Sequence, residues 1–545
     1  MLRPRLREAG DAALLAELPA RIDPMTNAAV LQLGQRVRAA ALKGVRDIVP
    51  GIRSLAVFFD PLHADVEALK ALLLSKALEP DIVAEGRRHK IPVVYGGDAG
   101  PDLLSVAQTS GLSVDALIAG HSGRDYRVYM LGFLPGFAYL GTLDPAIVAA
   151  RLPVPRVRVP AGSVGVAGRQ TGIYPRESPG GWGLIGRTPL AMFDAAGDSP
   201  ARFAPGDIVR FVPVAGADWP VNAPTDHEAG RHTTPVIEVM HAGMLTSVQD
   251  LGRTGRQAVG VSVAGAMDRV AHRVANALVG NESTAATLEV TVAGPELRCL
   301  RDTVIAVTGA DLSPRIDGRR VTANQPLVVP EGGVVSFGER RTGARAYVAF
   351  AGGIDVPLVL GSRATHVASG QGGVAGRAVR AGDRLALFAR GPLPRRTPPR
   401  PAHEAARGGA RVRVLSGPQV DSFAAEALTR LTSARFLVSP ASNRMGYRLT
   451  GAPVPAPAGE MISDITFPGA IQVPPSGEPI LLMADRQTTG GYAQLAIVIT
   501  ADLPVVGQLA PGDWVEFEVT TPAEALAALV DQERMIQHFE GHAFA

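Results

Sequence analysis

The densest group of polar side chains lies in a glycine-rich segment, residues 161–187. Glycine lets a loop bring several backbone N–H groups to one point, and nearby Arg and Gln side chains can hold a carboxylate or an amide. Hairpin turns would also explain the glycines. We predict a polar ligand site here with Glu177 as its catalytic acid. The expected binding residues are Arg169, Gln170, Thr171, Tyr174, Ser178, Gly181 and Trp182.

A second polar group occupies residues 485–488, which read Asp-Arg-Gln-Thr. An acid, a base, an amide and a hydroxyl in four consecutive residues favour a polar site. The Arg-Gln-Thr run also repeats that of residues 169–171, so we expect the two runs to face one shared cleft. The binding residues predicted here are Asp485, Arg486, Gln487 and Thr488.

Acidic residues in the middle of the chain have a functional and a structural interpretation. Asp268 opens a predicted helix, where it either caps the helix N-terminus or acts as a catalytic acid beside an anion bound there. Glu289 lies within a predicted strand and faces either solvent or a pocket. We expect Glu289 to bind substrate or nucleotide, together with Gln249, Asp250, Arg253 and Met267.

Aromatic residues surround a Pro-Gly turn at residues 129–141. Such a turn can present Phe137 and Tyr139 to a ligand, although a hydrophobic corner of a barrel would explain them as well. The histidines form no helical pair beside a glutamate, so they predict no metal site. His121, just before a predicted strand, is the histidine that we expect to take part in catalysis.

The elements that must position these groups differ along the chain. Residues 1–100 alternate helical and strand-like segments, which predicts a small α/β (ferredoxin-like) domain. Beyond them, short strands separated by Gly and Pro predict barrels or sandwiches, with one helix near 268–279 and a terminal helix at 522–539. The fold class is therefore mainly β with α+β parts. We place β-rich parts at residues 101–215, 236–390 and 411–545, and linkers at 216–235 and 391–410.

An internal repeat relates the two ends of the chain. The runs Val-Pro-Ala-Gly-Ser, Arg-Gln-Thr, Gly-Gly-Trp and Pro-Gly-Asp begin at residues 159, 169, 180 and 205. Similar runs begin in the same order at residues 473, 486, 490 and 511. Four matched elements in one order predict two homologous lobes, joined by loops of different length.

Composition excludes several classes of function. The net charge is only +3 and no basic run is interleaved with aromatics, so we expect no nucleic-acid partner. No apolar run reaches membrane-spanning length and no secretory signal is visible, while the single cysteine, Cys299, fits a reducing compartment. We therefore expect a cytoplasmic protein with no membrane contact. No lysine follows Lys90, so the later lobes can carry neither a P-loop lysine nor covalently attached biotin.

Several of these runs resemble a known family. Residues 128–187 resemble allophanate hydrolase subunit 1 or KipI, also called the B-type subunit of 5-oxoprolinase. Residues 236–517 resemble allophanate hydrolase subunit 2 or KipA, the C-type subunit of 5-oxoprolinase, through Thr-Ser-Val-Gln-Asp-Leu-Gly-Arg, Gly-Ala-Met-Asp, Arg444-Met-Gly and Asp-Arg-Gln-Thr-Thr-Gly-Gly-Tyr. The pair also resembles the carboxyltransferase part of biotin-dependent urea carboxylases. The resemblance implies a fusion protein with two cyclophilin-like β-barrel lobes. It departs at residues 366–373, where the family pattern is bulkier.

The resemblance implies three functions, which the sequence leaves open. In the first, the chain is the B and C component of an ATP-dependent 5-oxoprolinase, a hydrolase that opens 5-oxo-L-proline to L-glutamate with a separate A-type (lactam-utilisation) subunit. ATP, with Mg expected, would phosphorylate the lactam oxygen. In the second, it is the carboxyltransferase component of a urea or amide carboxylase whose biotin is on another chain. In the third, it is a non-enzymatic regulator of a sensor kinase, like KipI and KipA. Homo-oligomerisation also stays open.

Overall fold

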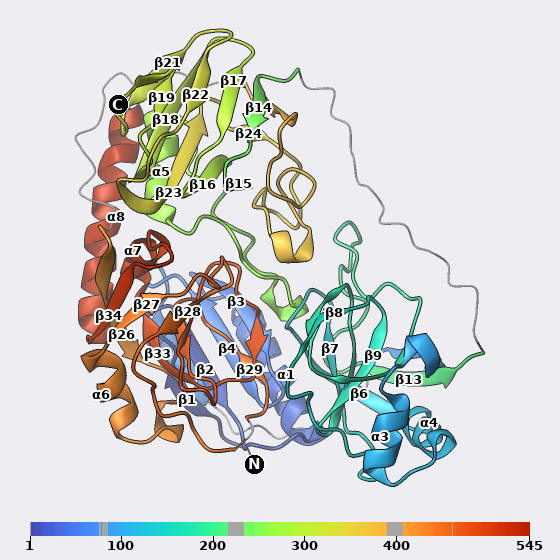
Figure 1. Cartoon of the computed structure of the whole chain (residues 1–545). Coiled ribbons are helices and arrows are strands. Elements are labelled where there is room, and N and C mark those ends of the chain that lie inside the picture. The colour runs from blue at the N-terminus through green and yellow to red at the C-terminus, as the bar shows by residue number, and fades with distance from the viewer. Residues whose placement is uncertain are drawn as a thin grey trace.

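The computed structural model describes residues 2–75, 78, 86–215, 234–389, 407–459 and 461–544. Figure 1 shows a β-sandwich in its upper part, one barrel at the lower right, and a second barrel packed with an α/β unit at the lower left. The two predicted linkers lie largely outside the described residues. The prediction of a mainly β chain with two barrel lobes and a small N-terminal α/β unit is confirmed.

The N-terminal unit is an antiparallel sheet with two helices on one face. Its strands run in the order β1-β2-β4-β3, and alternate residues of β2 and β4 face opposite sides. One side packs against the helices, and the other packs against the second barrel, far along the chain, rather than against the lobe that follows directly. The elements are β1 (Arg5–Glu8), β2 (Ala13–Glu17), α1 (Pro24–Ala40), β3 (Val45–Pro50), β4 (Ser54–Phe59) and α2 (Val66–Leu74).

The first barrel is closed by a parallel pair of strands, β5 with β13. The sequence placed β5 in the N-terminal unit, but this pairing makes it part of the barrel. Two helices, α3 (Leu103–Ser110) and α4 (Val114–Ser122), and a two-stranded ribbon of β8 (Arg156–Val159) and β11 (Ser178–Gly180) accompany the barrel. The barrel strands are β5 (Arg88–Tyr95), β6 (Asp125–Leu131), β7 (Ala138–Gly141), β9 (Ser163–Ala167), β10 (Gln170–Ile173), β12 (Gly183–Arg187) and β13 (Ile208–Pro213).

The second barrel repeats the first one strand for strand. It is closed by the parallel pair of β26 and β34, and its strands follow the same spatial and chain order. It carries the same kind of ribbon, formed by β29 (Asp464–Ile465) and β32 (Thr489–Gly490). The prediction of two homologous lobes is therefore confirmed. The barrel strands are β26 (Gly409–Ser416), β27 (Arg435–Val438), β28 (Gly446–Thr450), β30 (Ala470–Gln472), β31 (Ile480–Leu482), β33 (Gln494–Val498) and β34 (Trp514–Val519).

The structure corrects the register of the repeat. The Arg-Gln-Thr run at residues 169–171 enters β10, whose counterpart is β31, whereas the run at 486–488 lies after β31 and leads into β32. The true counterpart of residues 486–492 is 176–182, which aligns without a gap and makes Arg176 equivalent to Arg486. The Val-Pro runs are also displaced, because one precedes β9 and the other follows β30. Gly- and Pro-rich turns recur between the short strands, so similar runs can occur at positions that are not equivalent.

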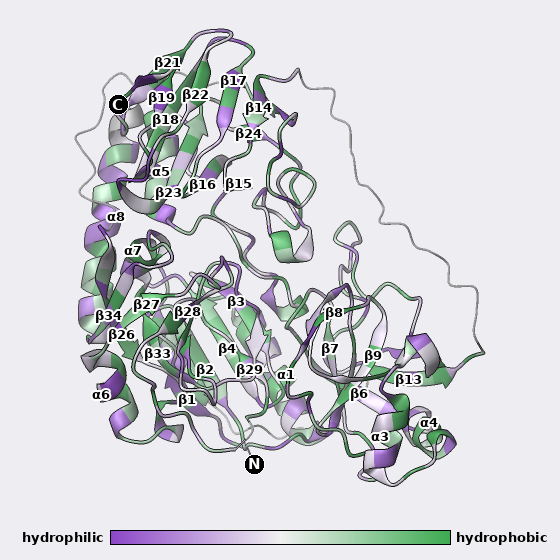
Figure 2. Cartoon of the chain, in the orientation of Figure 1, coloured by the Kyte–Doolittle hydropathy of each residue, from purple (hydrophilic) through white to green (hydrophobic). Residues whose placement is uncertain are grey.

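The sandwich joins the two barrels in sequence. Its buried side chains fill the space between a seven-stranded and a five-stranded sheet, whose strands appear largely green in Figure 2. The first sheet contains β14 (Ile237–His241), β17 (Glu296–Cys299), β19 (Arg315–Ile316), β20 (Arg319–Arg320), β22 (Val334–Ser336), β24 (Ile354–Asp355) and β25 (Arg384–Leu387). The second contains β15 (Leu245–Gln249), β16 (Thr287–Thr291), β18 (Thr303–Asp311), β21 (Pro326–Val329) and β23 (Thr342–Phe350).

The terminal helix α8 (Pro522–Phe544) ties the sandwich to the second barrel, along the left side of Figure 1. Its first turns pack on the barrel with Ala525 and Leu529. Its later turns pack on helix α5 (Arg269–Leu278) of the sandwich, where Arg273 forms ion pairs with Glu533 and Glu540. The smaller helices α6 (Glu426–Ser433) and α7 (Leu503–Gly507) belong to the second barrel.

Candidate functional site

His121, predicted as a catalytic residue, lies fully buried in the first barrel. Its Nδ1 is 2.7 Å from the Tyr95 hydroxyl, its Nε2 is 2.9 Å from Thr171 Oγ1, and its ring stacks 4.6 Å from that of Phe211. Burial lowers the pKa of His121 to about 3, so the imidazole is neutral at pH 7. Both polar atoms have protein partners, which favours a structural role for His121 and Thr171.

The aromatic residues of the predicted site form one cluster at a corner of the first barrel. Phe137 makes edge-to-face contacts with Tyr139, Tyr174 and Trp182 at ring separations of 5.0 to 5.5 Å. The four side chains are nearly inaccessible to solvent. The Tyr139 hydroxyl lies 3.2 Å from Thr489 Oγ1 of the second barrel. This corner therefore packs the two barrels together, as the hydrophobic interpretation of the Pro-Gly turn expects.

The polar residues of the same segment do not converge. Glu177, the predicted acid, is exposed and accepts two hydrogen bonds from Arg158, at 3.0 and 2.8 Å, which lower its pKa. Arg169 is exposed in the turn before β10. Ser178 and Gln170 are buried, and Ser178 Oγ and Gln170 Nε2 have no hydrogen-bond partner. The Gly181 carbonyl accepts a hydrogen bond from the Leu152 amide.

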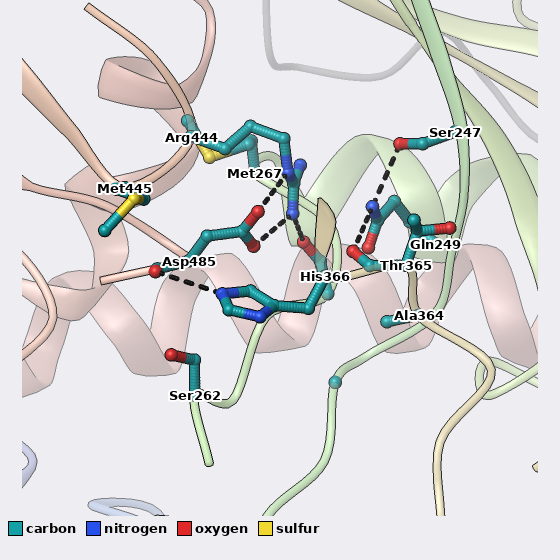
Figure 3. A network of polar contacts seen from close by, with 12 residues as sticks. Ser247, Gln249, Ser262, Met267, Ala364, Thr365, His366, Arg444, Met445 and Asp485 are labelled. Atoms are coloured by element: carbon teal, nitrogen blue, oxygen red, sulfur yellow. Dashed lines mark hydrogen bonds and ion pairs between the residues drawn. The ribbon is translucent and has the colours of Figure 1, made fainter. Parts of the chain in front are cut away.

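A buried ion network joins the sandwich to the second barrel (Figure 3). Arg444, just before β28, donates to both carboxylate oxygens of Asp485, at 3.0 and 2.9 Å, and also to Glu289 of β16. Burial alone would raise the pKa of Glu289, but Arg444 and Arg345 outweigh it and hold that pKa below its usual value. The Glu289 carboxylate is therefore charged at pH 7.

Asp268 extends this network as the N-cap of helix α5. One carboxylate oxygen accepts from the Ala271 amide at 2.8 Å, and the other accepts from Gln508 Nε2 at 2.7 Å. The Asp268 amide donates to the Tyr347 hydroxyl, which itself donates to Glu289 at 2.7 Å. The Met267 amide also donates to Glu289. Asp268 is thus the capping residue of the structural interpretation, since both of its carboxylate oxygens accept hydrogen bonds from within the protein.

Gln249 and Arg253 bond to the adjacent loop carbonyls of Thr365 and Ala364, and each keeps one polar atom without a partner. Gln249 Nε2 donates to Thr365 O at 3.1 Å and to Ser247 Oγ at 3.0 Å, and because a carbonyl only accepts, these bonds fix the orientation of the amide. Its Oε1 is left without a partner, as is Nη1 of Arg253. Arg253 uses its other guanidinium nitrogens to hold Val359 O and Ala364 O.

The same loop continues into residues 366–373 and contacts the second barrel. His366 Nε2 lies 3.4 Å from Asp485 O, and the backbone of His366 pairs with that of Gln371, whose buried Oε1 also has no partner. Figure 3 shows Gln249, Thr365, His366 and Asp485 around one region of the interface. Asp250 supports the loop by accepting hydrogen bonds from Ser362 Oγ and from the Arg363 amide. One unpartnered guanidinium nitrogen and two unpartnered amide oxygens are thus held around this loop.

Arg486 faces a different neighbour. Its Nη2 donates to Gln257 Oε1 at 2.6 Å, and the Gln257 side chain and amide donate to Asp47 of the N-terminal unit. Burial lowers the pKa of Arg486 to about 9. Arg486 Nε and Thr488 Oγ1 have no partner, and Gln487 is half-buried between them. The expected shared cleft is wrong, because Thr171 Oγ1 bonds inside the first barrel whereas Arg486 bonds to Gln257.

The structure therefore brings together the sandwich residues Gln249, Asp250 and Arg253 with Asp485, whereas His121, Thr171 and Glu177 bond within the first barrel. Sequence reasoning missed the other members of the junction. Arg444 lies in the Arg-Met-Gly run that resembles the family, so this run could have identified Arg444 as a candidate. The remaining missed residues are single polar side chains within apolar strands or loops, namely Arg345, Tyr347, His366 and Gln371.

The described residues hold no group of three or more His, Cys, Asp or Glu side chains placed to bind a metal ion. Within the same residues, no single helix has the length and apolar character needed to span a membrane, although α3 and α4 pass that test together as a bent pair.

Two family models match the chain. The model of the carboxyltransferase domain, subdomain C and D, matches residues 4–203, and that of subdomain A and B matches residues 259–519. The C-type subunit of 5-oxoprolinase from Escherichia coli K12 is 37% identical over 303 residues, which are 55% of this chain and 97% of that protein. The B-type subunit of 5-oxoprolinase from Escherichia coli O157:H7 is 42% identical over 218 residues, 39% of this chain and 97% of that protein. The chain belongs to the carboxyltransferase-domain family that includes the B-type and C-type subunits of 5-oxoprolinase.

Solved structures of this family extend the comparison. The crystal structure of TTHA0988 superposes with a TM-score of 0.83 at 37% identity, and covers 94% of this chain and 100% of that one. Such coverage shows that one chain of the family can hold both parts in the same arrangement. The urea carboxylase of Kluyveromyces lactis superposes with a TM-score of 0.53 at 32% identity, and covers 58% of this chain and 30% of that one.

Proposed function

We propose that the chain is the B and C component of an ATP-dependent 5-oxoprolinase, which opens 5-oxo-L-proline to L-glutamate together with a separate A-type subunit. The observation that carries the proposal is the pair of unpartnered groups at the sandwich edge, Arg253 Nη1 and Gln249 Oε1. A substrate that fits them offers a carboxylate to the guanidinium and an N–H to the amide oxygen. 5-Oxoproline has both groups on one small ring.

The proposal gives each of these side chains a defined task. Arg253 would bind the carboxylate of the substrate, and Gln249 would orient the ring by accepting from the lactam N–H. Both side chains are at most 1% exposed. Substrate entry therefore requires the loop of residues 362–373 to move away from the second barrel. Five glycines in or beside this loop, at 361, 370, 372, 373 and 376, all have positive φ, which gives this region backbone freedom that other residues lack.

ATP with Mg²⁺ is part of the proposal, but the described residues do not form a recognisable site for it. No metal-binding group is found among them, and no lysine follows Lys90 to hold phosphates as in a P-loop. We therefore assign no residue of this chain to the nucleotide and derive no step through it. The tasks proposed for this chain are to bind, orient and enclose the ring.

Carboxyl transfer to a urea-like amide is the second candidate. It is favoured by the similarity to the urea carboxylase of Kluyveromyces lactis. A urea-like substrate could donate an N–H to Gln249, but it has no carboxylate for Arg253, so the buried Nη1 of Arg253 would stay without a partner. This difference makes 5-oxoproline the better fit. Arg253 is therefore the side chain whose substitution distinguishes the two candidate functions.

The test is glutamate release from 5-oxoproline and ATP by the full chain mixed with its A-type subunit. We expect release that depends on both proteins. Arg253→Met should lower kcat/KM by about 10- to 100-fold, because a charge-assisted hydrogen bond contributes about 1.5 to 3 kcal/mol. Arg319→Met, at an exposed arginine of β20, is the matched control and should change nothing. If no glutamate forms, and a biotin carboxylase partner instead supports carboxylation of urea, the second function replaces the first.

A further inference from the structure

The two ribbons that accompany the barrels can be aligned through their glycines. In the first barrel Gly180 lies opposite Arg156, and in the second Gly490 lies opposite Asp464. Since Gly180-Gly181-Trp and Gly490-Gly491-Tyr align without a gap, Arg156 corresponds to Asp464. A register shift between Ser178 and Gly180 adds one residue to β8, so Val157 and Arg158 together take the place of Ile465 in β29. The internal repeat thus allows the surroundings of one ribbon to be compared with those of the other.

The ribbon of the second barrel is covered by the N-terminal sheet of the same chain. Ile465 is only 1% exposed and belongs to a cluster with Phe58 of β4 and the neighbouring Phe467, whose rings lie 5.4 Å apart. Ser54 of β4 donates a hydrogen bond to Asp464. A sheet face of small and apolar residues thus closes this side of the barrel. Its members facing the barrel are Ala13, Leu15, Ala56 and Phe58.

The ribbon of the first barrel is bare. Val157 is 82% exposed, and Val154, three residues before it, is 80% exposed. Arg158, the next residue along β8 after Val157, keeps 75% of its side chain in solvent, although it pairs with Glu177. Two almost fully exposed valines beside a position whose counterpart is buried indicate a surface that is built to be covered. Figure 1 shows β8 on the first barrel, whereas the N-terminal sheet packs on the other barrel.

A second copy of this chain does not fit that surface. The sheet that covers the equivalent ribbon is already buried against its own second barrel, so a neighbouring copy has no such face to offer. A twofold contact between two β8 ribbons would also bring Arg158 near Arg158 and repel. Within the described residues, Arg158 at the edge of the ribbon forms its ion pair with the exposed Glu177, and it favours a partner with carboxylates around an apolar sheet face.

We propose that the bare ribbon of the first barrel, β8 with residues 151–158, is the docking surface for the A-type subunit, which presents an apolar sheet face bordered by carboxylates. This inference rests on the proposed function for the identity of the partner. It goes beyond that function by naming where the partner binds. The arrangement makes the two barrels alike, with one ribbon covered within the chain and the other covered by a separate chain.

The experiment measures the affinity of the purified A-type subunit for the full chain by titration calorimetry. Val157→Asp places a charge in the apolar centre and should raise Kd by about tenfold or more. Arg158→Glu should also weaken binding, by repulsion from the carboxylates of the partner, and it needs no buried residue to change. Val328→Asp, at a valine of β21 that is 71% exposed, is the matched control and should leave Kd unchanged.

The outcomes separate the surface from the function. If the native chain binds and Val157→Asp and Arg158→Glu bind equally well, the surface is wrong while the oxoprolinase proposal stands. If the native chain does not bind, the inference fails, and glutamate release then decides the function independently. Sedimentation of the chain alone completes the test. A dimer that Val157→Asp dissociates would show that a second copy covers the ribbon and would overturn the proposal.

Discussion

The corners between the second and third strands of the two barrels have the same place in the fold and opposite chemistry. In the first barrel, the connection from β6 to β7 carries Phe137, which packs among aromatic rings. In the second, the connection from β27 to β28 carries Arg444, which binds the carboxylates of Glu289 and Asp485. The two barrels share their strand arrangement but differ in the side chains at this corner. The chemistry of a corner in one barrel therefore does not predict the chemistry of the same corner in the other barrel.

The neighbours of each corner explain this difference. The aromatic corner packs mainly through contacts between apolar rings, which need only matching shape and apolar area. Its Tyr139 hydroxyl also meets Thr489 Oγ1 of the second barrel. The charged corner contacts the sandwich, where Glu289 and Arg345 are buried in adjacent strands and require charged partners. The unpartnered groups of Gln249 and Arg253 lie on loops of the same sandwich. The proposed site and the Arg444 network thus both involve the sandwich.

The largest effect expected from this comparison is on stability, at Arg444. Arg444→Met would leave Glu289 and Asp485 buried without their main countercharge. We expect it to lower the free energy of unfolding by about 3 to 5 kcal/mol. Urea unfolding, followed separately by near-UV and far-UV circular dichroism, measures the change. A loss below about 1 kcal/mol would mean that solvent, and not Arg444, satisfies the two carboxylates.

A slightly smaller effect is expected at the aromatic corner. Phe137→Ala removes the ring that contacts Tyr139, Tyr174 and Trp182, and should cost about 3 kcal/mol through lost burial and the cavity left behind. Because the lost contacts are apolar, the effect should show no dependence on salt between low and physiological ionic strength. Unfolding in urea at two salt concentrations tests this. A strong salt effect at Phe137 would contradict the division into a dry and a charged corner.

A change in pH should distinguish the two ribbons. Burial raises the pKa of Asp464 above its usual value, so the folded state favours the neutral acid. Stability from this group is therefore present at low pH and is lost as the pH rises through its folded-state pKa. Asp464→Asn keeps an acceptor for Ser54 and should remove this fall, so it should be more stable than the native chain at pH 8. Thermal unfolding from pH 5 to pH 8 is the measurement, and parallel curves for the two proteins would disprove it.

The smallest effect is expected at the exposed pair of the first ribbon. Arg158→Met removes a contact with Glu177 that lies in solvent, where water and salt screen the attraction. The melting temperature should stay within experimental error of the native value. A clear loss of stability would mean that the pair organises the ribbon, and that its surface is less bare than its exposure indicates.

Much of the fold could be predicted from the sequence, because it depends on local patterns. Asp268 marked the start of α5, and the terminal helix was predicted at residues 522–539, within the observed α8. The repeat correctly predicted two lobes, although two of its four matches were displaced by one strand. Short turn motifs recur too often to fix a register, which only the strand pairing defines.

The candidate site was harder to predict, because it depends on contacts between distant segments. Gln249 and Arg253 were named from a polar run, but nothing local shows that they meet residues 364–366. Arg444 and Glu289 are 155 positions apart in sequence and meet only when the sandwich packs on the second barrel. In the first barrel, the opposite error occurred. Glycine-rich polar sequence suggested a site at residues 169–178, whereas these polar groups are divided between the barrel interior and its surface.

The central claim is that the sandwich edge, and not the first barrel, binds the substrate. Equilibrium dialysis of radiolabelled 5-oxoproline against the full chain tests it most directly, with Arg253→Met and Arg169→Met compared with the native protein in the presence of the A-type subunit. The account predicts that Arg253→Met weakens binding by about tenfold or more, and that Arg169→Met changes it by less than about twofold. Loss of binding in Arg169→Met with unchanged binding in Arg253→Met would contradict it.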